Sequence, residues 1–163
     1  MTGDHDLSGD AAKLAAIAEA LADAVDAALP GWVERSVARL VEAHQGLVTG
    51  DIRAAARAAG AAAAREVGGQ VRALLATDVD EQRANPLAVL RAAVRHPAGV
   101  LAAAGVPPVV RSRFDEEQFP DDDYGLTPAT WSDIDPGLHE RGIVWGAAKA
   151  HVVLARRRAE GKR

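Results

Sequence analysis

The sequence contains no cysteine, which excludes disulfide bridges, thiolate nucleophiles and cysteine-ligated zinc sites. Its most continuous apolar stretch, residues 142–155, is shorter than the roughly 20 residues that a membrane-spanning helix needs. Lysine is scarce, with 3 residues against 16 arginines, and this bias together with abundant alanine is typical of a GC-rich genome. The formal net charge of −4 argues against nonspecific binding to nucleic acid, because such binding needs a basic surface.

Recognisable catalytic motifs are also missing. No G-x-S-x-G, H-E-x-x-H or calcium-loop pattern occurs, and the Gly68-Gly69 pair precedes no phosphate-binding pattern. We therefore expect no cofactor and favour a non-catalytic protein, with an enzyme as the alternative.

The length of 163 residues fits one domain that can bury a core without metal or disulfide. We predict a disordered acidic tail over residues 1–10, a helical domain over 11–158 and a basic tail over 159–163. The first ten residues lack the basic start of a secretory signal, and charged residues interrupt the apolar stretch that follows. We therefore expect a cytoplasmic protein.

Three alanine-rich helices are predicted over residues 11–76. Apolar residues recur there every three or four positions, which is the period of one helix face. Pro30-Gly31 is expected to end the first helix at about residue 29, so that the second spans about 32–48. The third helix is expected over about 51–76.

The composition changes at about residue 114. Five of the six aromatic residues lie from Phe114 onward, and nine acidic residues but no lysine or arginine occur between 115 and 140. A capping residue followed by proline predicts helix starts near residues 86, 128 and 136. These helices are expected over 86–95, about 128–133 and about 136–158, with Pro97 ending the first of them and a short helix over 98–104.

The fold class is therefore all-α, a small helical bundle. Between its helices, residues 106–127 form a long, irregular, proline-rich segment. Its aromatic residues predict that this acidic, aromatic segment packs against the C-terminal helix, with a mobile lid as the alternative. Segments of this length without regular structure are often functional.

The C-terminal stretch from Gly142 to Ala155, GIVWGAAKAHVVLA, contains only two polar side chains, Lys149 and His151. These two point about 160° apart around a helix, so apolar surface covers almost the whole circumference. A helix of this kind is normally buried. We therefore predict a central core helix, covered by the N-terminal helices and by residues 114–131.

The candidate functional surface comprises Trp131, His139, Trp145, Lys149 and His151. A desolvated lysine can act as a base or nucleophile, but a lysine whose ammonium reaches water or a carboxylate is the commoner case. Trp145 lies one turn before Lys149, which predicts a cation–π contact. His139 and His151 point about 120° apart, so they cannot share a ligand on this helix alone.

Asp121, Asp122 and Asp123 are candidate metal ligands, to which Asp133 and Asp135 could add, because hard cations bind carboxylate oxygens. Their spacing does not match a calcium loop. We therefore predict no metal site and favour a solvated acidic loop balanced by nearby arginines.

Four segments of the second half form a pattern: NPLAVLRAAVRHP (85–97), GVPPVVR (105–111), FPDDDYGLTP (119–128) and DIDPGLHERGIVWGAAKAHVVLARR (133–157). They resemble an uncharacterised type of alanine-rich protein from actinobacteria. The resemblance covers roughly the last half of the chain and implies a bacterial cytoplasmic setting. It carries no activity, substrate or cofactor.

Three hypotheses of function remain open. The favoured one is a non-catalytic helical protein that binds a protein partner or itself, because the last helix is unusually apolar. The second is a metal or enzyme site between residues 115–135 and Lys149/His151. The third is nucleic-acid binding by the basic end Arg156–Arg158, ranked last because of the negative net charge. No membrane partner is expected, and the sequence identifies no small-molecule ligand.

Overall fold

The computed structural model describes residues 3–76 and 90–161, and every regular element among them is a helix. The all-α fold class is therefore confirmed. The order is α1 (Gly3–Gln45), α2 (Gly50–Ala76), the 3₁₀ helix η1 (Leu90–Val94), α4 (Arg95–Ala103), α5 (Arg113–Gln118), α6 (Trp131–Ile134) and α7 (Leu138–Gly161). None of the described helices is long and apolar enough to cross a membrane.

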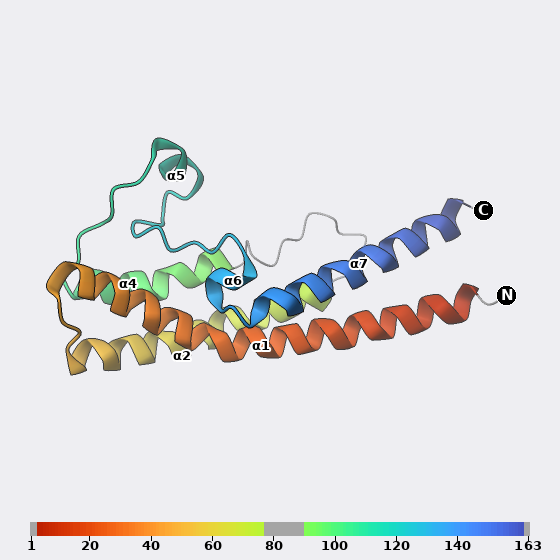
Figure 1. The fold of residues 1–163 in the computed structure, drawn as a ribbon, viewed down its shortest axis with the longest axis horizontal. Coiled ribbons are helices and arrows are strands. Elements are labelled where there is room, and N and C mark those ends of the chain that lie inside the picture. The colour runs from red at the N-terminus through yellow and green to blue at the C-terminus, as the bar shows by residue number, and fades with distance from the viewer. Residues whose placement is uncertain (1–2, 77–89, 162–163) are drawn as a thin grey trace.

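α1 is one continuous helix where the sequence predicted two. Pro30 lies inside it, and Figure 1 shows that α1 bends part-way along its length. Proline removes a helical hydrogen bond and crowds the preceding turn, so a kink is expected at this point. The helix continues because Leu29 and Val33, on either side of the proline, are fully buried in the same core. The predicted end at residue 29 was wrong, and α1 begins at Gly3, within the predicted acidic tail.

α2 runs back along α1 and confirms the helix predicted over 51–76 (Figure 1). Its buried residues lie on one face: Ala56, Gly60, Ala63, Val67, Gly68, Val71 and Leu75. At Gly60 the two backbones approach closely, because a Cβ atom there would lie 2.9 Å from the Cα and carbonyl oxygen of Pro30. The small residue on α2 therefore fits against the kink of α1.

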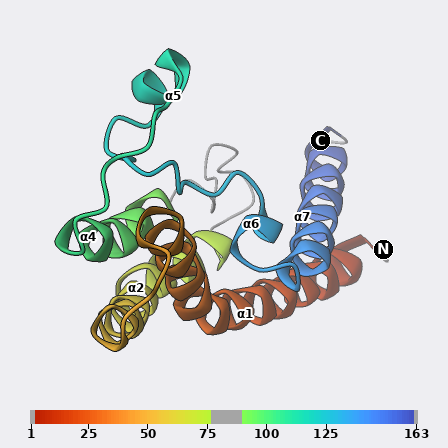
Figure 2. The same ribbon diagram turned by 60° about the vertical axis from the view of Figure 1, so that its left-hand side comes forward.

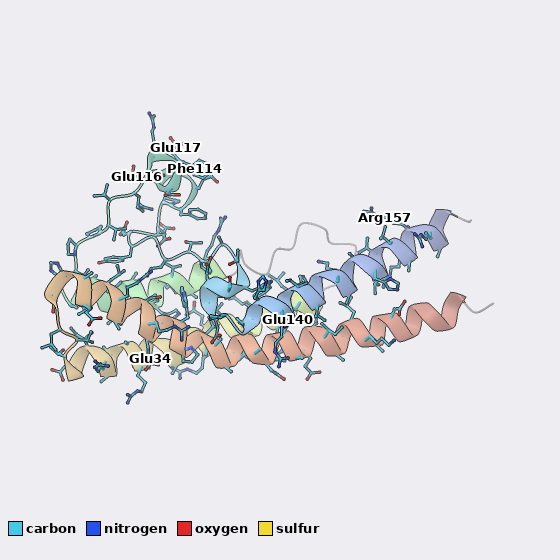
Figure 3. The ribbon with its side chains drawn as sticks, viewed as in Figure 1. Glu34, Phe114, Glu116, Glu117, Glu140 and Arg157 are labelled. Atoms are coloured by element: carbon cyan, nitrogen blue, oxygen red, sulfur yellow. The ribbon has the colours of Figure 1, made fainter. Side chains whose placement is uncertain are left out.

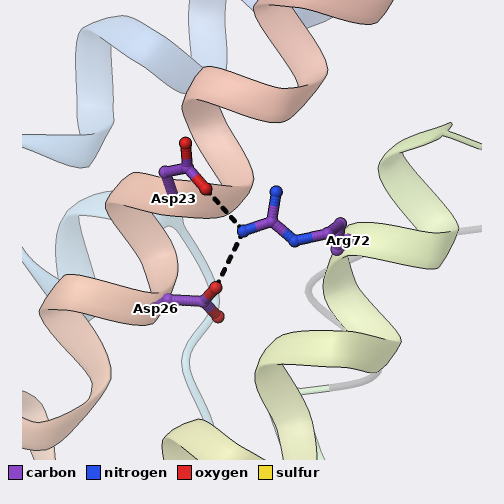
Figure 4. A network of polar contacts seen from close by, with 3 residues as sticks. All are labelled: Asp23, Asp26 and Arg72. Atoms are coloured by element: carbon purple, nitrogen blue, oxygen red, sulfur yellow. Dashed lines mark hydrogen bonds and ion pairs between the residues drawn. The ribbon is translucent and has the colours of Figure 1, made fainter.

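An ion-pair network joins α1 and α2 further along (Figure 4). The Nη2 atom of Arg72 donates to Asp23 Oδ1 at 2.6 Å and to Asp26 Oδ2 at 2.9 Å. These two hydrogen bonds raise the pKa of the Arg72 guanidinium. Gly68 lies one turn before Arg72, and a Cβ atom there would collide with the Asp26 carboxylate. The glycine thus leaves room for the network.

α4 follows directly on η1 and packs against α1 and α2. Pro97 lies in the first turn of α4, where a missing N–H is tolerated, so the prediction that it ends a helix was wrong. Gly105, with a φ angle of +78°, follows the end of α4 at the position predicted. The predicted connector 77–85 and residues 86–89 of the predicted helix lie outside the described residues.

The segment predicted to be irregular, residues 106–127, contains the short helix α5. Ser112 caps α5, since its Oγ atom accepts a hydrogen bond from the Asp115 N–H at 3.1 Å. Figure 2 shows α5 above α4, on the side of the molecule away from α7. The predicted packing against the C-terminal helix was therefore wrong for α5, and α6 is the element that contacts α7. α7 itself extends to Gly161, into the predicted basic tail.

Candidate functional site

α7 packs against α1 through one face only. Its buried residues are Leu138, Gly142, Trp145 and Val152. Its large exposed apolar residues are Ile143, Val144 and Leu154, with exposed fractions of 57%, 47% and 52%. The prediction of a helix buried on all sides was wrong, because its main contacts are with α1 and α6 and the opposite face meets solvent.

Four exposed apolar residues form a line along α7, which we name the α7 stripe: Ile143, Ala147, Ala150 and Leu154. Their spacings of four, three and four residues follow the seam of a coiled coil. At 100° per residue the centre of the stripe lies about 170° from Trp145, which faces α1. The stripe therefore lies on the face of α7 opposite Trp145.

Charged residues continue the same line at both ends of the stripe. Glu140 precedes Ile143 by three residues and Arg157 follows Leu154 by three, which are again seam spacings. Both charged side chains are exposed. Figure 3 labels them toward opposite ends of α7. The seam on this helix thus has an acidic end, an apolar middle and a basic end.

Trp131 and His139, two of the predicted site residues, meet where α6 packs against α7. The Trp131 ring lies on Gly142, where a Cβ atom would be only 2.6 Å from the indole Nε1 atom. Trp131, His139, Gly142 and Ile143 line a shallow hollow of about 330 Å³. The hollow opens beside the first residue of the α7 stripe.

The other three predicted residues have structural contacts. The Lys149 Nζ atom lies 5.0 Å from the centroid of the Trp145 ring, so the predicted cation–π contact is confirmed. His151 Nε2 lies 3.0 Å from Asp10 Oδ2 and links α7 to α1. Sequence reasoning missed Asp10 as a partner, because 141 residues separate the two. Lys149 lines none of the cavities described here, so these residues do not form one pocket.

The three aspartates of the acidic cluster also serve different purposes. Asp122 is only 6% exposed, and it accepts hydrogen bonds from the Leu126 N–H, the Thr127 N–H and the Thr127 hydroxyl at 2.7–2.8 Å. An aspartate shortly before a Gly-x-Thr sequence is a turn signal that sequence analysis did not use. Asp121 is exposed, and Asp123 lies 3.8 Å from the guanidinium of Arg111.

Tyr124 closes the same loop, since its hydroxyl donates to the Val106 carbonyl oxygen at 2.8 Å. Burial raises the pKa of Tyr124, and the nearby Asp123 charge raises it further. Among the described residues, no group of three or more histidine, aspartate or glutamate side chains could hold a metal ion. The acidic cluster and Lys149/His151 lie on different elements and share no contact that would make them one site.

A polar cavity of about 390 Å³ lies between α1 and residues 125–128. Its lining includes Trp32, Arg35, Ser36, Arg39 and Asp133. Arg35 Nη2 donates to the Ile134 carbonyl oxygen at 2.7 Å, and Asp133 accepts from the N–H groups of Ala129 and Thr130. Arg35 therefore ties α6 to α1, and Asp133 holds the loop that precedes α6 in its turn.

No family model matches this chain, and no curated protein or solved structure matches it either. The class of protein is thus defined by its own architecture. It is an all-α protein with a long kinked helix and a C-terminal helix that exposes an apolar seam.

Proposed function

We propose that this chain is a non-catalytic helical module that associates with a second copy of itself through α7. The observation that carries the proposal is the exposed α7 stripe. Apolar residues at coiled-coil spacing are normally buried against another helix, and a contiguous apolar face on a protein surface marks an interaction site. On α7 that face lies opposite the buried residues Trp145 and Val152, and only its first residue, Ile143, lies beside α6.

The contacts of the predicted site residues favour association over catalysis. Lys149 lies on an aromatic ring, and His151 lies beside a carboxylate of α1. Asp122 holds three donors of its own loop. Lys149, His151 and Asp122 therefore each have a structural partner, whereas the apolar seam has none among the described residues.

The seam is short, and this limits the expected affinity. Ile143 and Leu154 are each about half exposed, so covering each of them gains roughly 1 kcal/mol. Association also costs translational and rotational freedom. We therefore expect a reversible dimer with a dissociation constant in the range of about 1 μM to 1 mM.

Sedimentation velocity over that concentration range tests the proposal. The wild-type protein should shift from monomer to dimer, whereas Leu154→Glu should stay monomeric because it places a charge in the seam. The matched control is Leu47→Glu, which changes a leucine that is 68% exposed between α1 and α2. It should dimerise like wild type, and circular dichroism should show both variants folded. A wild-type protein that is monomeric throughout would contradict the proposal.

Nucleic-acid binding by Arg156–Arg158 stays a prediction, with the net charge of −4 against it. The affinity for nucleic acid would fall steeply with salt, whereas the affinity of an apolar seam for a second copy would not. Retention on heparin that falls steeply with salt would support this prediction, because released counterions drive such binding.

A further inference from the structure

We infer that the two copies pair with their α7 helices antiparallel, about a two-fold axis that passes level with the midpoint between Ala148 and Lys149. This inference rests on the proposed self-association and adds its geometry. In an antiparallel pair about such an axis, residues equally distant from the midpoint lie opposite each other. The pattern of size and charge along the seam of α7 is matched to this arrangement.

The apolar residues pair by size. Ile143 lies opposite Leu154 of the second copy, and Ala147 lies opposite Ala150. Two large side chains therefore meet at each end of the apolar seam, and two methyl groups meet at each side of its centre. Small central residues let the helix axes approach to about 8 Å. The hollow beside Ile143, lined also by Trp131 and His139, leaves space around the large pair.

The charged ends decide the orientation. Glu140 lies opposite Arg157 of the second copy, because both are the same distance from the midpoint. In a parallel pair Glu140 would face Glu140 and Arg157 would face Arg157. Exposed ion pairs add little affinity, but like charges across a seam select against the wrong orientation. The charges of α7 therefore favour the antiparallel dimer.

Arg158 lies about 50° from the centre of the stripe, on the same side as Glu140, so it also flanks the seam, opposite His139 of the second copy. Two further charges at these levels do not enter the seam. Arg141 and Arg156 also lie opposite each other in this register, and both are basic. Each points about 150° away from the centre of the stripe on a helix of 3.6 residues per turn. Arg156 instead helps to line a groove between α1, α2 and α7. Their like charge therefore does not oppose the arrangement.

A charge-reversal cycle tests the register. Glu140→Arg alone and Arg157→Glu alone should each raise the dimer dissociation constant by about tenfold, because each places like charges opposite one another at both ends of the seam. The double variant, Glu140→Arg with Arg157→Glu, should recover most of the wild-type affinity. The matched control is Glu116→Arg, on α5 away from α7 (Figure 3), which should leave the dissociation constant unchanged. Unaltered dimerisation in both single variants would overturn the inference.

Cysteine cross-linking tests the orientation directly, because the native chain has no cysteine. A mixture of Ile143→Cys and Leu154→Cys proteins should oxidise to a mixed disulfide dimer. Either variant alone should cross-link poorly, because its two cysteines would lie about 16 Å apart along the seam, beyond disulfide reach. Efficient cross-linking of one variant with itself, and not in the mixture, would show a parallel dimer and overturn the inference. That result would leave the proposed self-association intact. A protein that stays monomeric in sedimentation velocity would refute both the self-association and its antiparallel geometry.

Discussion

The aspartates Asp121, Asp122 and Asp123 occupy different environments although they are consecutive and chemically identical. Asp122 is buried beneath its own loop and holds three donors, while Asp121 is exposed. A buried carboxylate that satisfies backbone N–H groups replaces the water those groups would otherwise bind. At the scale of the residue, the acidic cluster is therefore an anchor for the loop and not a shared ligand set.

This difference predicts unequal effects on stability. Asp122→Ala should lower the free energy of unfolding by about 2–3 kcal/mol, because it leaves buried donors without an acceptor. Asp121→Ala should change it by less than about 0.5 kcal/mol. Urea unfolding followed by circular dichroism measures both values. Equal effects of the two substitutions would show that the Asp122 hydrogen bonds do not hold the loop.

α1 is the element on which the other helices are arranged. Its buried residues from Ala18 to Val41 face α2, α4 and α7, and its kink at Pro30 meets the glycine of α2 that allows close approach. A continuous helix through a proline needs compensation from tertiary packing. At the Pro30–Gly60 contact, backbone atoms and not flexible side chains lie against the glycine, so the packing there cannot readily give way.

The contact predicts opposite outcomes for two glycines of α2. Gly60→Ala should lower the free energy of unfolding by about 1–3 kcal/mol, because the added methyl group would press on the backbone of Pro30. Gly69→Ala should raise it by about 0.5–1 kcal/mol, since that site is exposed and open and alanine favours helix. Thermal and urea unfolding at low protein concentration distinguish them. A stabilising Gly60→Ala would mean that the helices separate at little cost.

The whole molecule is elongated, with α7 and the first half of α1 side by side and both termini at one end (Figure 1). Fewer helices surround this end than the opposite end, where α2 and α4 pack on α1 and η1 packs on α2 and α4. Among the described elements, α1 and α6 are the ones that pack on α7, and they leave its opposite face exposed. An exposed apolar seam on α7 is therefore a consequence of the architecture, and a second copy is the cover that we propose.

Dimer formation predicts that the thermal stability depends on protein concentration. Above the dissociation constant, the unfolding midpoint of the wild-type protein should rise by about 2 °C for each tenfold increase in concentration, by mass action. The midpoint of Leu154→Glu should not change over the same range. Differential scanning calorimetry measures both, with Leu47→Glu expected to follow the wild type. A concentration-independent wild-type midpoint would speak against a folded dimer.

Local features of the fold could be predicted because they depend on neighbouring residues. The helical period of alanine-rich segments indicated α2 within one residue of its observed start and at its observed end. Glycine commonly follows the end of a helix, which predicted Gly105 after α4. Residues four apart on a helix are neighbours, which predicted the Lys149–Trp145 contact. The apolar composition of α7 was also apparent from the sequence alone.

Only the tertiary structure decided which of these surfaces are covered. The helix continues through Pro30 because α2 packs against both sides of the kink, and no local rule contains that information. Asp122 is buried because of the path that its own loop takes across the fold. His151 contacts Asp10 because α7 lies beside α1, although 141 residues separate the two side chains in the sequence. Sequence by itself determined that α7 is apolar around its circumference. Whether that surface is core or seam depends on how many elements surround it, because burial is a property of the neighbours and not of the helix.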